Sequence, residues 1–396
     1  MTGVQPGNDI ALVMGGGGAR AAYQVGVLRS IARRYPDLEI PILTGVSAGA
    51  INAAFLGNCT QDFKGGVEAL IELWTGLTTE QVFRTDTLAL LRTAFGWGVK
   101  LASGGRHVGP APRGLVDTSP LRQFLTRALS GPDGVMSGIQ ENLRCARLKA
   151  VAITTTNYSN GMAVTHVQSN GAPMWSRPHR VSVETPLTVE HVLASAALPL
   201  FFPAVKIGEA WHGDGGVRLT APLSPALHLG AGRILAISTR YEPGPNEANL
   251  PAKIDYPPAA QVIGLLLSAV FLDMLDFDAL NMDRINRLLD ALPDEKRRGL
   301  RTAGLLLLRP SRNLAVLAGE AEARLPQPFR FLLRGTGTRE VKSPDSLSMV
   351  MFESSFIRQA IELGEQDGDA RQDEIAAFLT GQDMPGMNDT GCLRVG

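Results

Sequence analysis

Short apolar runs alternate along this chain with longer stretches in which apolar residues recur every three or four positions. The short runs are rich in Ile, Leu and Val, and such runs, bounded by glycine or proline, are typical of buried strands. The longer stretches have the periodicity of helices that bury one face. The pattern predicts strands at residues 10–14, 40–44, 148–155, 162–167, 234–239 and 305–308.

Strands that alternate with helices in this way predict an α/β layered sandwich, in which a mostly parallel central sheet is flanked by helices. One connection differs, because Asn160-Gly161 joins the strand at 148–155 to the strand at 162–167, and this dipeptide is a strong hairpin signal. Ligands bind at the carboxyl ends of the strands in open parallel sheets, so candidate functional residues are expected there.

A long amphipathic helix is predicted over residues 272–292, ended by Pro293. Charged residues lie off its apolar stripe, so we expect the stripe to cover the core. A contact with a partner, including a homodimer, is the alternative use of this face. The stripe consists of Leu272, Leu275, Ala279, Met282, Ile285, Leu289 and Leu292.

Two glycine-marked turns follow the first two predicted strands. The run Gly15-Gly16-Gly17-Gly18 comes directly after residues 10–14, and it lays out backbone N–H groups at a helix start, where negative charge is favoured. The second turn, Gly45-Val46-Ser47-Ala48-Gly49, is a G-x-S-x-G elbow that presents Ser47 between a strand and a helix. A nucleophile beside an anion-binding backbone is what acyl transfer from an ester requires.

Nucleotide binding is the alternative that a glycine-rich first turn suggests. The dinucleotide fingerprint G-x-G-x-x-G is broken here by Arg20 or Ala21, depending on its starting glycine, and no P-loop triplet occurs in the chain. A third element, Asp214, lies among glycines between Trp211 and Leu219, where we expect a turn. Taken alone, this pattern around Asp214 indicates an ordinary Asx turn, but together with Ser47 it favours a catalytic site.

These three pieces, in this order, resemble the patatin-like phospholipase family. The family pattern reads here as Gly16-Gly17-Gly18-Ala19-Arg20, then Gly45-Val46-Ser47-Ala48-Gly49, then Asp214-Gly215-Gly216. The resemblance covers roughly residues 10–380, and one departure is Ala21, where many members have glycine. Further segments similar to the family lie at residues 114–121, 194–203, 305–311 and 351–353.

The resemblance implies a Ser–Asp dyad and no metal or organic cofactor. Ser47 would be the nucleophile and Asp214 the proton acceptor. The implied reaction is hydrolysis of fatty-acyl esters of phospholipids or lysophospholipids. The oxyanion donors would be Gly16, Gly17 and Gly18, with Arg20 steadying that loop. The elbow and the aspartate loop would be supported by Gly45, Gly49, Gly215 and Gly216.

Other catalytic arrangements remain open. A Ser–acid–His order needs a histidine after Asp214, and only His228 follows, in a stretch predicted to be a short structural helix. His212 is kept as an auxiliary group, and the other histidines lack metal-ligand spacing. An acyltransferase or thioesterase would use the same serine, and a membrane-associated regulatory protein would carry the site in silent form.

Composition narrows the functional classes further. The 38 basic residues are balanced by 38 acidic ones, so the composition shows no excess of positive charge of the kind that binds nucleic acids. The three cysteines are widely spaced and do not have the pattern of a disulfide framework. No signal peptide is visible, and the longest apolar run, residues 262–272, is too short to span a bilayer. We therefore expect a cytoplasmic enzyme that contacts its lipid substrate, with at most a peripheral contact with the membrane surface.

The predicted organisation is a catalytic core at residues 8–240, a loop at 241–258, a mostly helical C-terminal region at 259–385 and a flexible tail at 386–396. The C-terminal region is expected to pack on the core and to hold a strand near residues 304–309. Within the core, residues 84–117 are a candidate lid or membrane-docking insertion. Their basic and aromatic residues suit an anionic surface, and an ordinary surface insertion is the alternative.

Overall fold

The computed structural model describes residues 9–84, 114–130, 135–244, 259–325, 330 and 345–381. Most of the predicted insertion (85–113), much of the predicted loop (245–258) and the predicted tail (386–396) lie outside these residues. Among the helices described, none combines the length and apolar character that crossing a bilayer requires.

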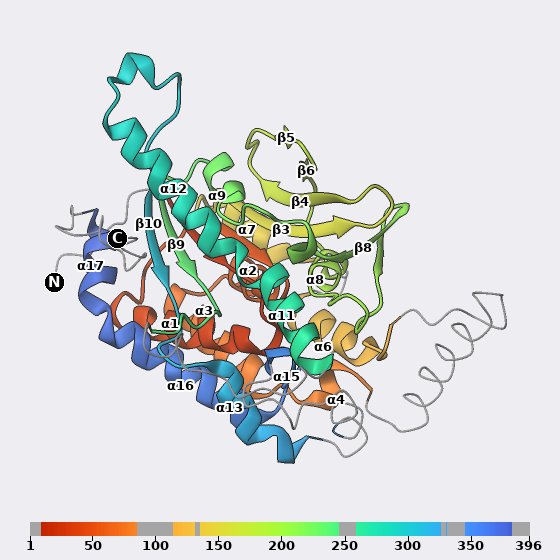
Figure 1. Cartoon of the computed structure of the whole chain (residues 1–396). Helices are drawn as coiled ribbons and strands as arrows, with labels where there is room; N and C mark the ends of the chain where they lie inside the picture. The colour runs from red at the N-terminus through yellow and green to blue at the C-terminus, as the bar shows by residue number, and fades with distance from the viewer. Residues whose placement is uncertain are drawn as a thin grey trace.

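A mostly parallel sheet forms the centre of the molecule, as the alternation of strands and helices predicts (Figure 1). Neighbouring strands in its parallel part run in the same direction throughout, so their carboxyl ends share one edge. In spatial order these strands are β10 (Gly304–Leu308), β9 (Arg233–Ile237), β1 (Ile10–Met14), β2 (Ile42–Val46) and β3 (Ala150–Asn157).

Beyond β3 the sheet becomes mixed. The predicted hairpin is confirmed, because β4 (Met162–Ser169) pairs antiparallel with β3. A second antiparallel partner, β8 (Ala210–Asp214), joins the carboxyl end of β3 and pairs in turn with β7 (Val205–Ile207). The far edge is formed by β6 (Arg180–Glu184) and β5 (Ser176–Arg177).

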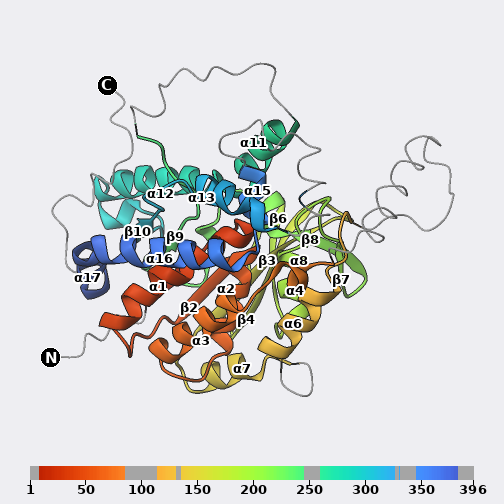
Figure 2. The same ribbon diagram turned by 90° about the horizontal axis from the view of Figure 1, so that it is seen from below.

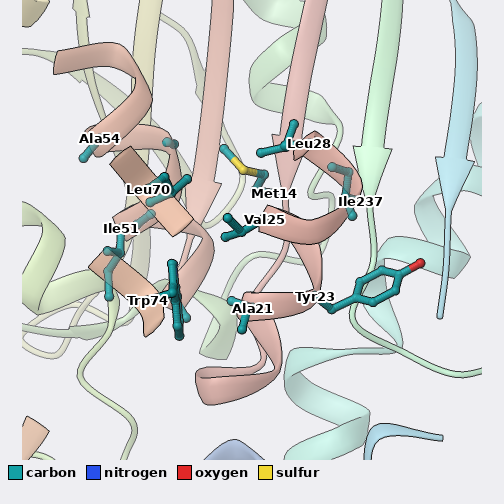
Figure 3. Packing of buried hydrophobic residues seen from close by; sticks show 14 of the residues in the cluster. Met14, Ala21, Tyr23, Val25, Leu28, Ile51, Ala54, Leu70, Trp74 and Ile237 are labelled. Carbon is teal, nitrogen blue, oxygen red and sulfur yellow. The ribbon is translucent and has the colours of Figure 1, made fainter. Parts of the chain in front are cut away.

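Alternating side chains on the central strands face two separate cores. Ile10, Leu12 and Met14 of β1 point toward the helices of the first layer, which includes α1 (Ala22–Arg34), α2 (Ala48–Asn58), α3 (Phe63–Thr75) and α16 (Ser354–Ala370). Figure 3 shows Met14 and Trp74 within this packing. Ala11 and Val13 point to the opposite face. The result is an α/β layered sandwich, as the sequence predicts.

The second face is covered by α9 (Ser224–His228) and α12 (Met274–Asp290). The predicted amphipathic helix is therefore present, and its first half packs on the core as expected. The prediction is wrong for Ile285 and Leu292, which are exposed. Figure 1 shows that the later part of α12 extends past the end of the sheet, although the stripe residue Leu289 is still buried there.

The remaining helical elements lie outside the central sheet. Strand β10 pairs with β9 in the central sheet, so the C-terminal region packs against the core. The predicted division of the chain between residues 240 and 259 stays a prediction. The helical elements outside the central sheet that have not yet been named are η1 (Gly18–Ala21), α4 (Thr79–Val82), α6 (Ser119–Leu129), α7 (Ser137–Arg144), α8 (Val189–Ser195), η2 (Gly215–Val217), α11 (Ala259–Phe271), η3 (Asp294–Lys296), α13 (Leu314–Ala321), η4 (Glu322–Arg324), α15 (Asp345–Met349) and α17 (Gln372–Thr380).

Two local expectations need correction. Strand β2 begins at Ile42 rather than Ile40, directly after Pro41, which has no N–H to give to a sheet. The segment before Asp214, expected as a turn, is strand β8, because it pairs with the end of β3. Tertiary pairing thus makes a strand of a segment whose glycine content alone favours a turn.

Candidate active site

Ser47 lies at the carboxyl end of β2, where the chain turns sharply into α2. Its backbone has φ 57° and ψ −131°, a conformation that is unfavourable for a residue with a side chain. The flanking glycines permit the turn: a Cβ on Gly45 would lie 2.4 Å from the Gly49 carbonyl oxygen, and a Cβ on Gly49 would lie 2.2 Å from the Met14 oxygen. The elbow therefore holds its serine in place through close backbone packing.

Asp214 ends β8 and faces Ser47 across the carboxyl edge of the sheet. Its Oδ2 accepts a hydrogen bond of 2.7 Å from the Ser47 hydroxyl, and its Oδ1 accepts the Gly216 N–H at 2.9 Å. The aspartate is fully buried, and this burial raises the pKa of Asp214 to about 7, although both hydrogen bonds act in the opposite direction. The carboxyl group is thus poised between its two protonation states near neutral pH.

The glycine run after β1 lies directly beside Ser47. A Cβ on Gly16 would be 2.9 Å from the Ser47 Cβ, and both Gly17 (φ 140°) and Gly18 (φ 57°) are left-handed. Within the described part of the chain, neither Gly17 nor Gly18 donates its N–H to a backbone carbonyl. A backbone segment with unpaired donors at the start of a helix suits an anion.

Buried side chains hold this glycine run from behind. Thr239 donates its hydroxyl to the Gly16 carbonyl at 2.7 Å, and the Gln24 amide donates to the Gly15 carbonyl at 2.9 Å. Asn52 in turn donates to the Gln24 side-chain oxygen and accepts from the Trp74 indole. With its carbonyls bound on one side, the loop is fixed before any ligand arrives.

Arg20, predicted to steady the loop, is buried and reaches far along the chain. Its Nε donates to the Ser348 hydroxyl of α15 at 2.7 Å. The next residue, Met349, places its carbonyl oxygen 2.0 Å from where a Cβ of Gly18 would lie. Arg20 therefore ties α15 against the glycine run, and its predicted role in an oxyanion site stays a prediction.

A mostly apolar cavity opens onto these groups. Ser47, Gly17 and Gly18 lie on its wall, and the rest is almost entirely hydrocarbon. The apolar part of the lining includes Ile51, Leu73, Trp74, Leu125, Leu198 and Phe352.

The segments at 114–121 and 194–203, noted above for their resemblance, lie side by side. Leu115 and Val116 donate their N–H groups to the carbonyls of Leu200 and Phe201. Both segments contribute to the cavity, through residues such as Leu121 and Phe202.

Ser195 is a site residue that the motifs do not identify. Its hydroxyl accepts the Ser47 backbone N–H at 3.0 Å and donates to the Thr154 carbonyl at 2.6 Å, and the side chain is fully buried. It therefore bridges the elbow to β3. The only sequence signal is its place in the segment 194–203, because the contact joins residues 148 positions apart.

No histidine in the described part of the chain hydrogen-bonds to the Ser47 hydroxyl, whose partner is Asp214. His212 Nδ1 bonds to Thr155 Oγ1 at 2.9 Å, and burial lowers the pKa of His212. His228 lies in the short helix α9, as expected, and bonds to Ser224. Among the residues that the structure describes, no cluster of three or more His, Cys, Asp or Glu side chains is suited to a metal ion.

Comparison with known proteins gives one family match. The family model of patatin-like phospholipase matches residues 12–227. A search of curated proteins gave no significant match.

The solved structures that match this chain have low sequence identity to it. VipD from Legionella pneumophila is 13% identical, with 87% of this chain and 67% of that chain covered and a TM-score of 0.33. Human GIVD cytosolic phospholipase A2 is 13% identical, with 95% and 60% covered and a TM-score of 0.48. Its complex with methyl gamma-linolenyl fluorophosphonate is 14% identical, with 96% and 59% covered and a TM-score of 0.43. The chain thus spans about three fifths of the length of the phospholipase A2 chains.

Proposed function

Because the chain belongs to the patatin-like phospholipase family, whose model matches more than half of its length, we propose that it is a serine lipid acyl hydrolase acting through Ser47 and Asp214. Its substrates would be fatty-acyl esters of phospholipids or lysophospholipids. The observation that carries the proposal is the 2.7 Å hydrogen bond from the hydroxyl of Ser47, which lies on the wall of an apolar cavity, to the buried carboxylate of Asp214.

In the first half of the reaction, the Ser47 oxygen attacks the ester carbonyl carbon while its proton passes to Asp214. A carboxylate is a weak base in water, and burial makes this one more basic. The negative charge on the carbonyl oxygen would be met by the N–H groups of Gly17 and Gly18. Collapse of the tetrahedral intermediate releases the alcohol, which takes the proton from Asp214, and leaves an acyl-enzyme on Ser47.

In the second half, Asp214 removes a proton from water as the water oxygen attacks the acyl-enzyme carbonyl. The same donors stabilise the second oxyanion, and the fatty acid leaves as Ser47 recovers its proton. The acyl chain would lie against the apolar lining of the cavity, and hydrocarbon burial there would supply binding energy at roughly 0.8 kcal/mol per methylene.

The proposal is tested by measuring fatty-acid release by mass spectrometry from a panel of phospholipids, lysophospholipids, acylglycerols and a short p-nitrophenyl ester. The wild type should release fatty acid, and Ser47→Ala should reduce release to the background level because no acyl-enzyme can form. Hydrolysis by Ser47→Ala at the wild-type rate would contradict the assignment of the nucleophile.

Two other outcomes correspond to other uses of the same serine. Transfer of the acyl group to an added alcohol or thiol in preference to water would indicate an acyltransferase. If no substrate is turned over, labelling with an alkyl fluorophosphonate separates a reactive site that needs an activator from a silent one.

We further expect Ser195→Ala to lower kcat by about 10-fold to 100-fold with a smaller effect on KM, because a displaced nucleophile loses its alignment with the ester. The buried Ser47 N–H would also be left unpaired, which costs about 1–3 kcal/mol of stability. Steady-state kinetics and chemical denaturation measure the two effects.

Ser182→Ala is the matched control for this variant. The Ser182 hydroxyl also accepts a backbone N–H, from Trp175, and donates to a backbone carbonyl, but it lies on β6. It should lower stability and leave kcat unchanged. Equal losses of kcat in both variants would show that Ser195 acts through stability alone.

A further inference from the structure

Helix α11 carries an exposed apolar face. The helix has no charged residue over its 13 positions, and Leu265 and Leu266 are each 62% exposed. A contiguous set of large apolar side chains on a surface marks an interaction site, whereas isolated ones are common. The exposed large side chains on α11 are Val262, Ile263, Leu265, Leu266 and Val270.

The inner face of α11 reaches the proposed acyl site. Leu267 and Phe271 pack against the main core, and Phe271 lines the cavity that contains Ser47. A Cβ on Gly216 would lie 2.4 Å from the Phe271 ring, so the end of α11 is in contact with the loop that follows Asp214. One helix therefore carries both the apolar outer face and a side chain that lines the apolar cavity.

Figure 2 shows α11 at the edge of the molecule, next to α15. Because α15 also packs against η1, α11 and the glycine run are two neighbours of the same short helix. A surface that contacts the outer face of α11 would therefore lie close to the cavity.

We propose that the outer face of α11 docks on a lipid surface and places the acyl cavity against it. The proposal rests on the lipid substrate proposed above. An uncharged helix with Leu, Ile and Val outward can bury that face at the boundary between headgroups and acyl chains. The docking is apolar, so it should depend weakly on anionic lipid and on salt.

The size of the face favours lipid over a second copy of the chain. A 13-residue helix is about 20 Å long and about 10 Å wide, which gives a footprint of roughly 200 Å². A stable protein–protein interface needs about 800 Å² on each partner. Partition of a few apolar side chains into a bilayer has no such minimum area.

The test uses co-sedimentation with phosphatidylcholine vesicles, in the Ser47→Ala background so that binding is read without turnover. Leu265→Glu with Leu266→Glu should lower the vesicle-bound fraction by about tenfold or more, because both side chains lose their burial in lipid. Leu288→Glu, in the later part of α12 and 67% exposed, is the matched control and should leave binding unchanged.

The same pair of substitutions, placed in the chain with Ser47 intact, should leave hydrolysis of a monomeric p-nitrophenyl ester unchanged. Failure of the proposed hydrolase would appear as no ester turnover with vesicle binding intact, so the two proposals fail separately. Unchanged vesicle binding by the double variant would overturn the docking proposal. So would binding that high ionic strength abolishes, or a shift from dimer to monomer by sedimentation velocity without loss of vesicle binding.

Discussion

Asp214→Asn is expected to lower kcat for ester hydrolysis by about 10²–10⁴-fold, the usual contribution of a general base. The substitution is nearly isosteric. The new side-chain oxygen can still accept the Gly216 N–H that Asp214 Oδ1 now accepts, and the amide can donate to Ser47. The fold should therefore persist while the group that receives the Ser47 proton is lost. Initial rates on the best substrate of the panel measure the effect.

The pH profile of the wild type provides an independent readout of the same group. Asp214 must be ionised to accept a proton, and its pKa is raised to about 7 by burial. We expect kcat/KM to fall about tenfold for each pH unit below 7 and to level off above it. A profile that is flat from pH 5 to pH 8, in a variant-free enzyme of full stability, would contradict Asp214 as the base.

Stability should move in the direction opposite to activity. The folded state holds the Asp214 proton more tightly than the unfolded state, whose pKa is near 3.8, so the free energy of unfolding falls as pH rises from about 4 to about 7. Above pH 7 the buried charge costs up to about 4 kcal/mol. Asp214→Asn should thus be more stable than the wild type at pH 8 and nearly equal at pH 4, as measured by chemical denaturation.

The opposite pH dependences expected for activity and stability are consistent with a site that keeps a destabilising buried charge because catalysis requires it. Within the described ranges of the chain, Asp214 has no cationic partner, and an asparagine could accept the Gly216 N–H in its place. The two hydrogen bonds it accepts lower its pKa and do not offset burial. The loss of stability caused by this buried charge is consistent with a catalytic role, because a carboxylate shielded from water is a stronger base than an exposed one.

The sequence predicted the parts of the site that are local in the chain. The elbow around Ser47 and the glycine run need particular residues within a few positions, because backbone conformation and close packing are set there. The α/β class followed from the alternation of strands and helices. The amphipathic stripe of α12 was correct where the helix lies over the sheet and also at Leu289, which is buried, while the exposed Ile285 shows that periodicity does not reveal where a core ends.

The parts that could not be predicted depend on contacts between distant residues. Ser195 reaches Ser47 across 148 positions, and Arg20 reaches Ser348 across 328. Neither serine has a local feature that distinguishes it from a surface residue. The apolar run at 262–272 was visible in the sequence, but its exposure and its contact with the cavity through Phe271 depend on how α11 packs.

Gly18→Ala is expected to lower kcat by about 10²–10³-fold, the cost of losing one oxyanion donor. The new Cβ would lie 2.0 Å from the Met349 carbonyl oxygen, and this obstacle is backbone, held through the neighbouring Ser348 by Arg20. The glycine run must therefore shift, and its N–H groups move away from the position of the ester oxygen. Because the donors act on the transition state, kcat should fall more than KM rises.

Gly208→Ala is the matched control, because it separates backbone strain from displacement of the loop. Gly208 has φ 58°, almost equal to the 57° of Gly18, but nothing lies within 4 Å of its Cβ position. Both variants carry the same left-handed strain of about 1 kcal/mol, and only Gly18→Ala meets the Met349 backbone. Steady-state kinetics should show near wild-type kcat for Gly208→Ala. Similar activities for the two variants would show that the glycine run at residues 16–18 does not supply the donors, and the oxyanion site would have to be sought elsewhere around Ser47.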